Sequence, residues 1–258
     1  MSEHPEEPDK PLAGGVAVVT GGSRGLGRQI VQAFAEAGAD VVIASRKMDS
    51  CERAAEEVAR STGARCLPYA CHVGHWDELA GLVDSAYDTF GRCDVLVNNA
   101  GMSPLYPSLA EVSEELFDKT IGVNFKGPFR LSALAGERMK VAGSGSIINI
   151  SSIAAIRPTP AELPYAAAKA ALNVLTAGFA LAYGPEVRVN TIMAGPFLTD
   201  VARAWDMEAF ERGAQHFPMR RAGNPREIVG AALYLASPAA SFTTGAVITV
   251  DGGCSITR

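Results

Sequence analysis

Short apolar runs rich in β-branched residues alternate along the chain with longer stretches of helical spacing. The first run, VAVVT at 16–20, precedes a stretch in which Leu26, Ile30 and Phe34 recur every four residues and Gly38 supplies a stop. The pattern predicts strands at 16–20, 40–45, 65–70, 94–99, 146–151, 187–193 and 246–250. It predicts helices near 25–38, 49–62, 76–90, 113–140, 163–183 and 225–236.

Seven apolar strands separated by helices are typical of a parallel sheet that is buried on both faces. Right-handed crossovers then make it a doubly wound α/β sheet, the Rossmann arrangement, with helices on both faces. Neither a linker nor an internal repeat is evident, so the pattern predicts a single domain over residues 12–258. The acidic, proline-rich residues 1–11 are expected to form a disordered tail.

The segment 196–218 breaks the alternation. Its apolar side chains have no core period; they are Phe197, Leu198, Trp205, Met207, Phe210 and Phe217. Ligands of such sheets bind beyond the carboxyl ends of the strands, where long segments often cover them. We therefore expect a substrate lid here, with a packed surface excursion as the alternative.

Composition narrows the function classes. The chain has 258 residues, 48% hydrophobic and 20% charged, with a net charge of −5, which argues against nucleic acid as a partner. We expect no apolar run to approach the length of a membrane span, roughly 20 residues, and the N-terminus has no signal-like segment. The sequence therefore predicts a cytoplasmic protein without a membrane partner. The five cysteines form no C-x-x-C pair and the four histidines lack partners at ligand spacing, so no metal site is predicted.

A glycine-rich turn, TGGSRGLG at 20–27, follows the first strand and opens the first helix. Gly21 permits the tight turn, while Gly25 and Gly27 let backbone and helix approach a pyrophosphate, whose charge suits the helix N-terminus. This strand–turn–helix setting predicts a dinucleotide site. The site also takes in Ser23, Arg24 and Leu26.

The second strand ends in ASRK at 44–47. An NAD site usually places an acid here, on the ribose 2′-hydroxyl, but this chain has Ser45 and Arg46. No carboxylate would repel a 2′-phosphate, and a guanidinium suits one. Arg24 can close on the same phosphate, so the sequence favours NADP(H) over NAD(H).

Further motifs follow in order: NNAG at 98–101, Asn124 in VNFKG, Ser152 in ISSI, Y-x-x-x-K at 165–169 and VDGG at 250–253. Together with T-G-x-x-x-G-x-G they resemble the short-chain dehydrogenase/reductase family over residues 12–254. The resemblance implies a catalytic tetrad of Asn124, Ser152, Tyr165 and Lys169. It also implies a homotetramer or homodimer built on the helices at 113–140 and 163–183.

Tyr165 and Lys169 lie one helical turn apart and therefore share a face. A lysine cation nearby is expected to lower the pKa of Tyr165 from about 10, so that its hydroxyl can exchange a proton with a carbonyl oxygen. The Ser152 hydroxyl can stabilise charge on that oxygen, with Ser151 as the near alternative.

Asn124 lies among poor interior helix residues: Gly122, Gly127 and Pro128. Local rules broken together often mark a functional distortion. A kinked helix that supports a proton relay to Lys169, as the family resemblance implies, is the functional interpretation. A glycine-assisted packing crossing, with Asn124 as a structural bridge, is the alternative.

The resemblance completes the set of cofactor contacts. Beyond the glycine loop they are Ser45, Arg46, His72, Val73, Asn98, Ala100, Gly101, Tyr165, Lys169, Gly195, Phe197 and Thr199. The NNAG asparagines can equally tie strands together. Two residues depart from the family: His72 replaces an Asp beside the adenine, and Ala194 replaces the Pro before Gly195.

The expected substrate is an apolar, non-sugar carbonyl compound or the matching alcohol. Candidate wall residues are Ser103, Leu105, Tyr106, Ile153, Met193, Phe197, Trp205, Met207 and Phe210. The expected activity is hydride transfer between this substrate and NADP(H), as in a ketone reductase or alcohol dehydrogenase.

Three other functions are alternatives. A 3-oxoacyl-(acyl-carrier-protein) reductase would need a basic surface, for which the candidates are Arg157, Arg203, Arg212, Arg220 and Arg221. Arg157 alternatively meets a substrate carboxylate. The intact tetrad argues against a non-catalytic dinucleotide-binding sensor, and the short segment after the last strand argues against a sugar-nucleotide epimerase.

Overall fold

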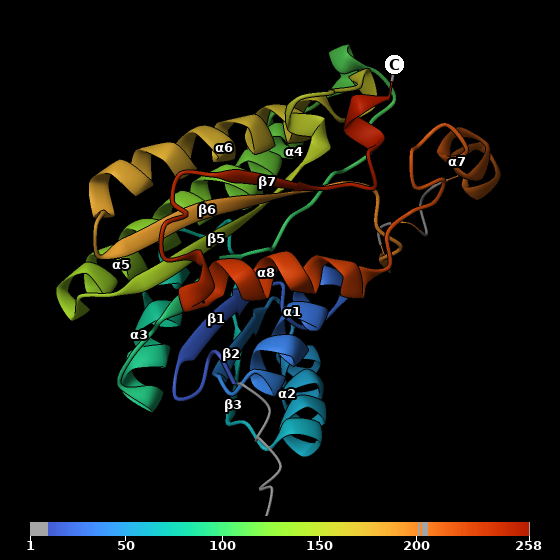
Figure 1. Ribbon diagram of the computed structural model, residues 1–258. Helices are drawn as coiled ribbons and strands as arrows, with labels where there is room; N and C mark the ends of the chain where they lie inside the picture. Colours follow the sequence, from blue (N-terminus) through green and yellow to red (C-terminus); the bar gives the residue numbers. More distant parts are fainter. Residues whose placement is uncertain (1–9, 201, 203–205, 258) are drawn as a thin grey trace, which may run out of the picture.

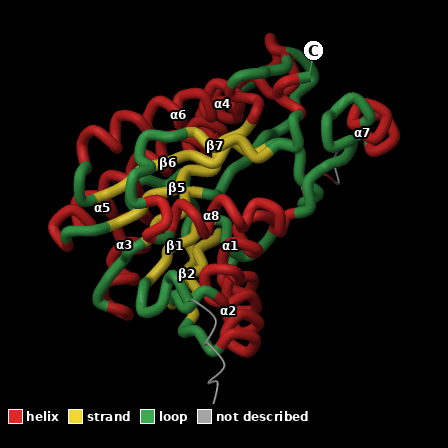
Figure 2. The backbone as a smooth tube through the Cα atoms, in the orientation of Figure 1, coloured by secondary structure: helices red, strands yellow, loops and turns green. Residues whose placement is uncertain are grey.

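A seven-stranded parallel sheet forms the centre of the computed structural model, which describes residues 10–200, 202 and 206–257 (Figures 1 and 2). The strands are β1 (Val16–Thr20), β2 (Asp40–Ser45), β3 (Cys66–Ala70), β4 (Val95–Asn98), β5 (Gly145–Ser152), β6 (Val187–Ala194) and β7 (Val247–Val250). Their order is β3-β2-β1-β4-β5-β6-β7, which confirms the predicted doubly wound fold. The order reverses between β1 and β4, where such sheets form a ligand crevice.

Helices cover both faces of the sheet (Figure 1). They are α1 (Gly25–Glu36), α2 (Met48–Thr62), α3 (Glu78–Phe90), α4 (Glu114–Ile121), α5 (Gly127–Ala142), α6 (Leu163–Tyr183), α7 (Met207–Ala214) and α8 (Val229–Ala236). One apolar core joins α1, α2 and α8 to the sheet, and the other joins α3, α5 and α6. Successive strand residues alternate between them: Val19 belongs to the first core and Val18 to the second.

The predicted long helix at 113–140 is interrupted. Between α4 and α5 the chain forms a π-helical turn, Gly122–Lys126, which holds the buried Asn124. Gly127 follows this turn and lies so close to the loop after β3 that an added Cβ would be 2.1 Å from the carbonyl oxygen of Val73. The glycines therefore serve a close backbone approach next to a locally widened helix.

α6 has the predicted bounds, 163–183, but it is more apolar than expected. Pro160–Tyr183 spans 24 residues and contains a window of mean hydropathy 1.3, enough by length and composition to cross a membrane. The prediction that no apolar run approaches this length is therefore wrong. α6 packs on β5 and β6, which gives it an apolar inner face, but only 33% of the window is buried. Outward-facing side chains such as Leu181 supply the rest of the apolar surface.

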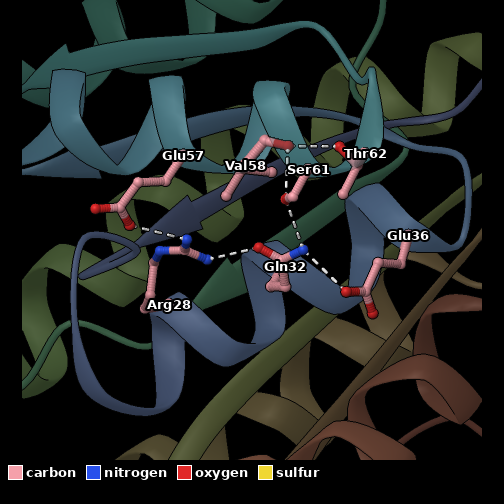
Figure 3. Close-up of polar contacts among 7 residues, drawn as sticks. All are labelled: Arg28, Gln32, Glu36, Glu57, Val58, Ser61 and Thr62. Carbon is pink, nitrogen blue, oxygen red and sulfur yellow. Dashed lines mark hydrogen bonds and ion pairs between the residues drawn. The ribbon is translucent and has the colours of Figure 1, made fainter.

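A polar network joins α1 to α2 on the outside of the sheet (Figure 3). Arg28 donates from Nη2 to Glu57 Oε2 (3.2 Å) and from Nη1 to Gln32 Oε1 (3.0 Å). Gln32 in turn donates to Ser61 Oγ (3.1 Å). These contacts hold α1, whose first turn completes the glycine loop, against its neighbour.

Two predicted segments lie partly outside the described residues. Of the predicted tail, only Lys10 and Pro11 are described, and they lead into the buried Leu12. The predicted lid at 196–218 includes residue 201 and residues 203–205, with Trp205 among them, which are not described. Its described part begins with the buried Phe197 and includes α7, which stands apart from the sheet in Figure 1.

Candidate active site

Tyr165 and Lys169 lie on the first turns of α6, beside the carboxyl end of β5. Lys169 is only 3% exposed, and its ammonium group donates a hydrogen bond to the carbonyl oxygen of Ile150 (2.8 Å). Its Nζ lies 5.7 Å from the centroid of the half-buried Tyr165 ring. The structure therefore brings the phenol and the buried cation together at one edge of the sheet.

The two serines at the end of β5 have different surroundings. The buried Ser151 hydroxyl donates to the carbonyl oxygen of Lys169 (3.1 Å). The half-buried Ser152 hydroxyl accepts from the Ala154 N–H (3.2 Å) and is hydrogen-bonded to Tyr165. Ser152 is thus the serine beside the phenol, while Ser151 ties the strand to α6.

Burial dominates the protonation of the Tyr165–Lys169 pair. Burial raises the pKa of Tyr165, the hydrogen bond with Ser152 lowers it, and the charge of Glu162 raises it further. Burial also lowers the pKa of Lys169 to about 8. The prediction that Lys169 lowers the pKa of Tyr165 is therefore wrong for the free protein, because desolvation disfavours the tyrosinate more than its neighbours favour it.

Asn124 fastens the π-helical turn to the loop after β4. Its Nδ2 donates to the carbonyl oxygens of Met102 (2.8 Å) and Thr120 (2.9 Å), and its Oδ1 accepts from the Met102 N–H (3.2 Å). A Cβ added to Gly101 would lie 3.0 Å from Asn124 Oδ1 and 3.5 Å from Lys169 Nζ. Asn124 Oδ1 and Lys169 Nζ therefore both lie next to Gly101, where even a methyl group would be crowded.

The glycine loop forms a cradle between β1 and α1. Gly21 and Gly25 have φ angles of +64° and +56°, which favour glycine. A Cβ on Gly27 would lie 2.4 Å from the carbonyl oxygen of Gly21, so the helix starts in contact with the loop. The N-cap residue Arg24 makes no side-chain cap hydrogen bond, which leaves the first N–H groups of this 12-residue helix without that acceptor. These features fit the pyrophosphate of a dinucleotide.

Ser45 and Arg46 lie where β2 ends. Ser23 Oγ donates to Ser45 Oγ (3.1 Å), which also lies 3.1 Å from Cys51 Sγ. Arg46 is exposed beside them. Arg24 pairs with Asp200 at 3.7 Å, but their side chains are 67% and 39% exposed, so this ion pair is weak. Arg46 is therefore the stronger candidate for a phosphate contact.

His72 lies in the loop after β3 and stacks on His75, with ring centroids 4.3 Å apart. Its Nδ1 accepts from the Gly74 N–H (3.1 Å), so a neutral ring carries its proton on Nε2. Burial lowers the pKa of His72, and the charges of His75 and Arg46 add to the effect. A donor thus stands where the family has an acceptor. The next residue, Val73, is buried.

The NNAG asparagines hold strands and loops together. Asn98 is buried, and its Nδ2 donates to Asn149 Oδ1 and Ser132 Oγ, both at 2.9 Å. Asn99 Nδ2 donates to the carbonyl oxygen of Thr20 (2.8 Å). The strand-tying interpretation therefore suits the Asn98 side chain, whereas Ala100 and Gly101 lie beyond the strand, next to the glycine loop and the tetrad.

The segment after β6 closes against the glycine loop. A Cβ added to Gly195 would lie 2.6 Å from Asp251 Cα, so β6 and β7 end in close contact. Phe197 is buried against Gly223 rather than facing open space. Thr199 lies 3.6 Å from the place of a Cβ on Gly25, which brings this segment to the dinucleotide cradle.

Some supporting groups have no role in the sequence predictions. The Thr20 hydroxyl donates to the Val97 carbonyl oxygen (3.2 Å) and accepts from the N–H groups of Asn99 (3.0 Å) and Ala100 (3.1 Å). Thr20 is the first letter of the glycine motif, so its position was a usable signal. The Ile150 carbonyl that holds Lys169 belongs to the backbone, and no residue type could reveal it.

A cavity of about 390 Å³ separates the start of α1 from the segment after β6, lined by Gly25, Arg28, Gln29, Leu198, Thr199, Asp200 and Pro225. A larger cavity of about 480 Å³ lies at the opposite edge of the sheet, where Gly15, Asp94, Ser146 and Arg188 line it. It is remote from the tetrad. The convergence of the side chains, and not cavity size, therefore locates the site.

Comparisons with known proteins agree with this geometry. A family model described as enoyl-(acyl carrier protein) reductase matches residues 21–255. Human dehydrogenase/reductase SDR family member 4 is 36% identical over 246 residues, covering 94% of this chain and 88% of its own. The NADPH-dependent 3-quinuclidinone reductase of Rhodotorula rubra has a TM-score of 0.90 at 31% identity, covering 100% of this chain and 98% of its own.

A third relative, the 7α-hydroxysteroid dehydrogenase of Escherichia coli, is 35% identical over 244 residues, which are 94% of each chain. A solved 7α-hydroxysteroid dehydrogenase with NADH and 7-oxo glycochenodeoxycholic acid has a TM-score of 0.90 and 35% identity, covering 95% of this chain and 96% of its own. The chain therefore belongs to the short-chain dehydrogenase/reductase family of nicotinamide-dependent oxidoreductases.

Proposed function

We propose that the protein is an NADP(H)-dependent carbonyl reductase or alcohol dehydrogenase that acts on an apolar substrate. The observation that carries the proposal is the convergence of Tyr165, Ser152 and the buried Lys169 at the edge of the sheet that also bears the glycine loop. Such a set combines a proton donor, a hydrogen-bond donor and a cation in one partly desolvated place.

A bound nicotinamide supplies or accepts the hydride at the substrate carbon. Burial keeps the pKa of Tyr165 above its ordinary value, so its hydroxyl is protonated at neutral pH and can protonate the carbonyl oxygen during reduction. Ser152 donates a hydrogen bond to the same oxygen as negative charge develops there. Lys169 donates to the carbonyl oxygen of Ile150, and Asn124 donates to that of Thr120. In this proposal the two side chains support the relay that returns a proton to Tyr165.

The choice of NADP(H) rests on the end of β2. Arg46 is exposed there beside the Ser23–Ser45 hydrogen bond, and the position of the usual acid is taken by Ser45. We expect NADPH to bind at least tenfold more tightly than NADH by fluorescence titration, and Arg46→Ala to remove most of that difference by weakening NADPH alone. Equal affinities, unchanged by Arg46→Ala, would contradict the assignment.

The reaction class is tested by a screen of carbonyl compounds for NADPH oxidation, which should include cyclic ketones, aromatic ketones, keto esters and acyl thioesters. We expect turnover of apolar ketones. The protein could instead bind NADPH while no carbonyl compound oxidises it and no alcohol reduces NADP⁺. That result would support a dinucleotide-binding sensor.

A 3-oxoacyl-(acyl-carrier-protein) reductase is less well supported. Of the arginines that could form a basic surface, Arg221 pairs with Glu227 at 2.7 Å and Arg212 lies 3.9 Å from Glu208. Arg157 donates to carbonyl oxygens near the C-terminus. Arg203 lies outside the described residues. An acidic carrier would have to compete with these internal partners.

The outer face of α5 and α6 supports a homo-oligomer, which we propose to be a tetramer. Aromatic rings link these helices to the loop before α3: the centroids of Trp76 and Phe129 lie 6.3 Å apart, and those of Phe129 and Phe179 lie 5.5 Å apart. Val174 is 73% and Leu181 87% exposed on α6. Large apolar side chains this exposed are typical of a subunit contact.

A further inference from the structure

The C-terminal segment Asp251–Thr257, here called the C-terminal brace, contacts the ends of the 196–218 segment and the loop after Ser152, here called the two walls. It begins directly after β7, whose last residue Val250 pairs with Ala194 of β6, which in turn pairs with Ser152 of β5. The brace therefore leaves the sheet in the row of residues that contains the catalytic serine. In Figure 1 the red C-terminal segment lies beyond this end of the strands.

Asp251 shapes the first half of the brace. Its carboxylate accepts from the N–H groups of Gly253 (2.9 Å) and Ser255 (2.7 Å), and its Cα packs on Gly195. Gly195 immediately precedes the segment 196–218, so the start of that segment packs on Asp251.

The end of the same segment contacts the next two residues of the brace. The Met219 N–H donates to the carbonyl oxygen of Gly252 (3.1 Å). A Cβ added to Gly253 would lie 2.5 Å from Pro218 Cγ. Both glycines have positive φ angles, +63° and +81°, so the tight turn and the close packing both need glycine. The brace thus holds the two ends of the 196–218 segment at once.

Arg157 fastens the second half of the brace to the opposite wall. Its Nη1 carries two N–H groups, which the carbonyl oxygens of Cys254 (3.3 Å), Ser255 (3.2 Å) and Thr257 share as acceptors, and it lies 3.5 Å from Thr257 Oγ1. The Arg157 N–H donates to the Ile153 carbonyl oxygen (2.8 Å), so the residue belongs to the short turn that starts at Ser152. One guanidinium group therefore joins the brace to the catalytic loop.

We infer that Arg157 is a positioning residue for substrate recognition: through the C-terminal brace it sets the 196–218 segment and the loop after Ser152 at a fixed separation. The inference rests on the proposed carbonyl reduction for its kinetic consequence. It assigns to Arg157 a bridge within the protein in place of a contact with a substrate carboxylate or a carrier protein. The glycine loop and the end of β2 lie outside these contacts, so we expect the affinity for NADPH to depend on Arg157 much less than substrate recognition does.

The test compares Arg157→Ala with Arg65→Ala in the full-length protein. Arg65 also donates to a carbonyl oxygen, that of Thr89 (3.1 Å), but next to β3. In hydrogen–deuterium exchange, Arg157→Ala should speed exchange at least fivefold in peptides from 153–162 and 196–219 and leave 20–46 unchanged. With a substrate from the carbonyl screen, KM should rise about tenfold, while kcat and the Kd for NADPH each change less than threefold. Arg65→Ala should show none of these effects.

Unchanged exchange in both walls, or a loss of NADPH affinity equal to the rise in KM, would overturn the inference. Faster exchange in both walls of a protein that reduces no carbonyl compound would leave the brace standing and remove the proposed function. Should Arg157→Ala fold poorly, Arg157→Lys retains the charge with a single ammonium donor and should give smaller changes in the same peptides. Wild-type exchange in that variant would count against the inference.

Discussion

Lys169 affects both the proposed chemistry and the stability of this protein. It places an ammonium group, 3% exposed, in a helix made mainly of alanine and other apolar residues, with the Ile150 carbonyl oxygen as its hydrogen-bond acceptor. A buried cation disfavours folding unless it is well compensated, and proteins keep such groups where function requires them. The lowered pKa of Lys169, about 8, expresses this cost directly.

The cost of the buried cation predicts a particular dependence of stability on pH. Between pH 8 and 10.5 the unfolded chain holds the Lys169 proton more tightly than the folded chain, so the free energy of unfolding should rise with pH through this window. Relative to Lys169→Met, the wild type should gain about 1 to 3 kcal/mol between pH 7.5 and 10. Urea unfolding of both proteins across this range measures the difference, and parallel curves would refute the assignment of the titration to Lys169.

At the residue scale, the identities of the tetrad could be predicted from spacing and from resemblance. The protonation state of the Tyr165–Lys169 pair could not be predicted in this way. Four-residue spacing puts Tyr165 and Lys169 on one face, but the pKa of Tyr165 depends on how much protein surrounds the phenol, and burial turns the shift upward. The partner of Lys169 is a carbonyl oxygen of the neighbouring strand, which only the tertiary fold brings near.

At the scale of elements, the π-helical turn between α4 and α5 interrupts a helix that the sequence predicts as continuous. Gly122, Gly127 and Pro128 marked the place in the sequence, because each is a poor interior helix residue. What they could not reveal is the reason, which is the contact of Gly127 with the backbone at Val73, far away in the chain. The Asn124 side chain bridges loop and helix next to Lys169, so the structural bridge is present, while the proton relay stays a prediction.

This close contact predicts opposite effects for two glycine substitutions. Gly127→Ala places a methyl group 2.1 Å from the Val73 carbonyl oxygen and should lower the free energy of unfolding by about 2 kcal/mol or more. Gly230→Ala in α8, where no atom lies within 4 Å of the new methyl group, should raise it by about 0.5 to 1 kcal/mol. Denaturant titrations measure both, and equal effects would contradict the packing argument.

For the whole molecule, the alternation of apolar runs and helical stretches sufficed to predict the doubly wound sheet, because strands buried on both faces must be nearly continuous in apolar residues. It also predicted the bounds of α6, but not that this helix has two apolar faces that serve different surfaces. The inner face packs on β5 and β6, and the outer face bears Val174 and Leu181. A single sequence records both faces as hydrophobic and does not distinguish them.

The outer face of α6 leads to a prediction about assembly. Leu181→Glu places a charge where a subunit contact would desolvate it, so it should shift the protein from tetramers to smaller species in light scattering after size-exclusion chromatography. Met48→Glu, on α2 and 41% exposed, is the matched control and should leave the mass unchanged. A Leu181→Glu protein that keeps the wild-type mass would place the subunit contact elsewhere.

The central claim is that Tyr165 transfers the proton that accompanies hydride transfer, and it is tested most directly by single-turnover oxidation of NADPH in Tyr165→Phe. This variant removes one hydroxyl group and keeps the ring that packs near Lys169. We predict that the hydride-transfer rate falls by about 10² to 10⁴ while the Kd for NADPH stays within twofold of the wild type. Hydride transfer at the wild-type rate in Tyr165→Phe would contradict the account.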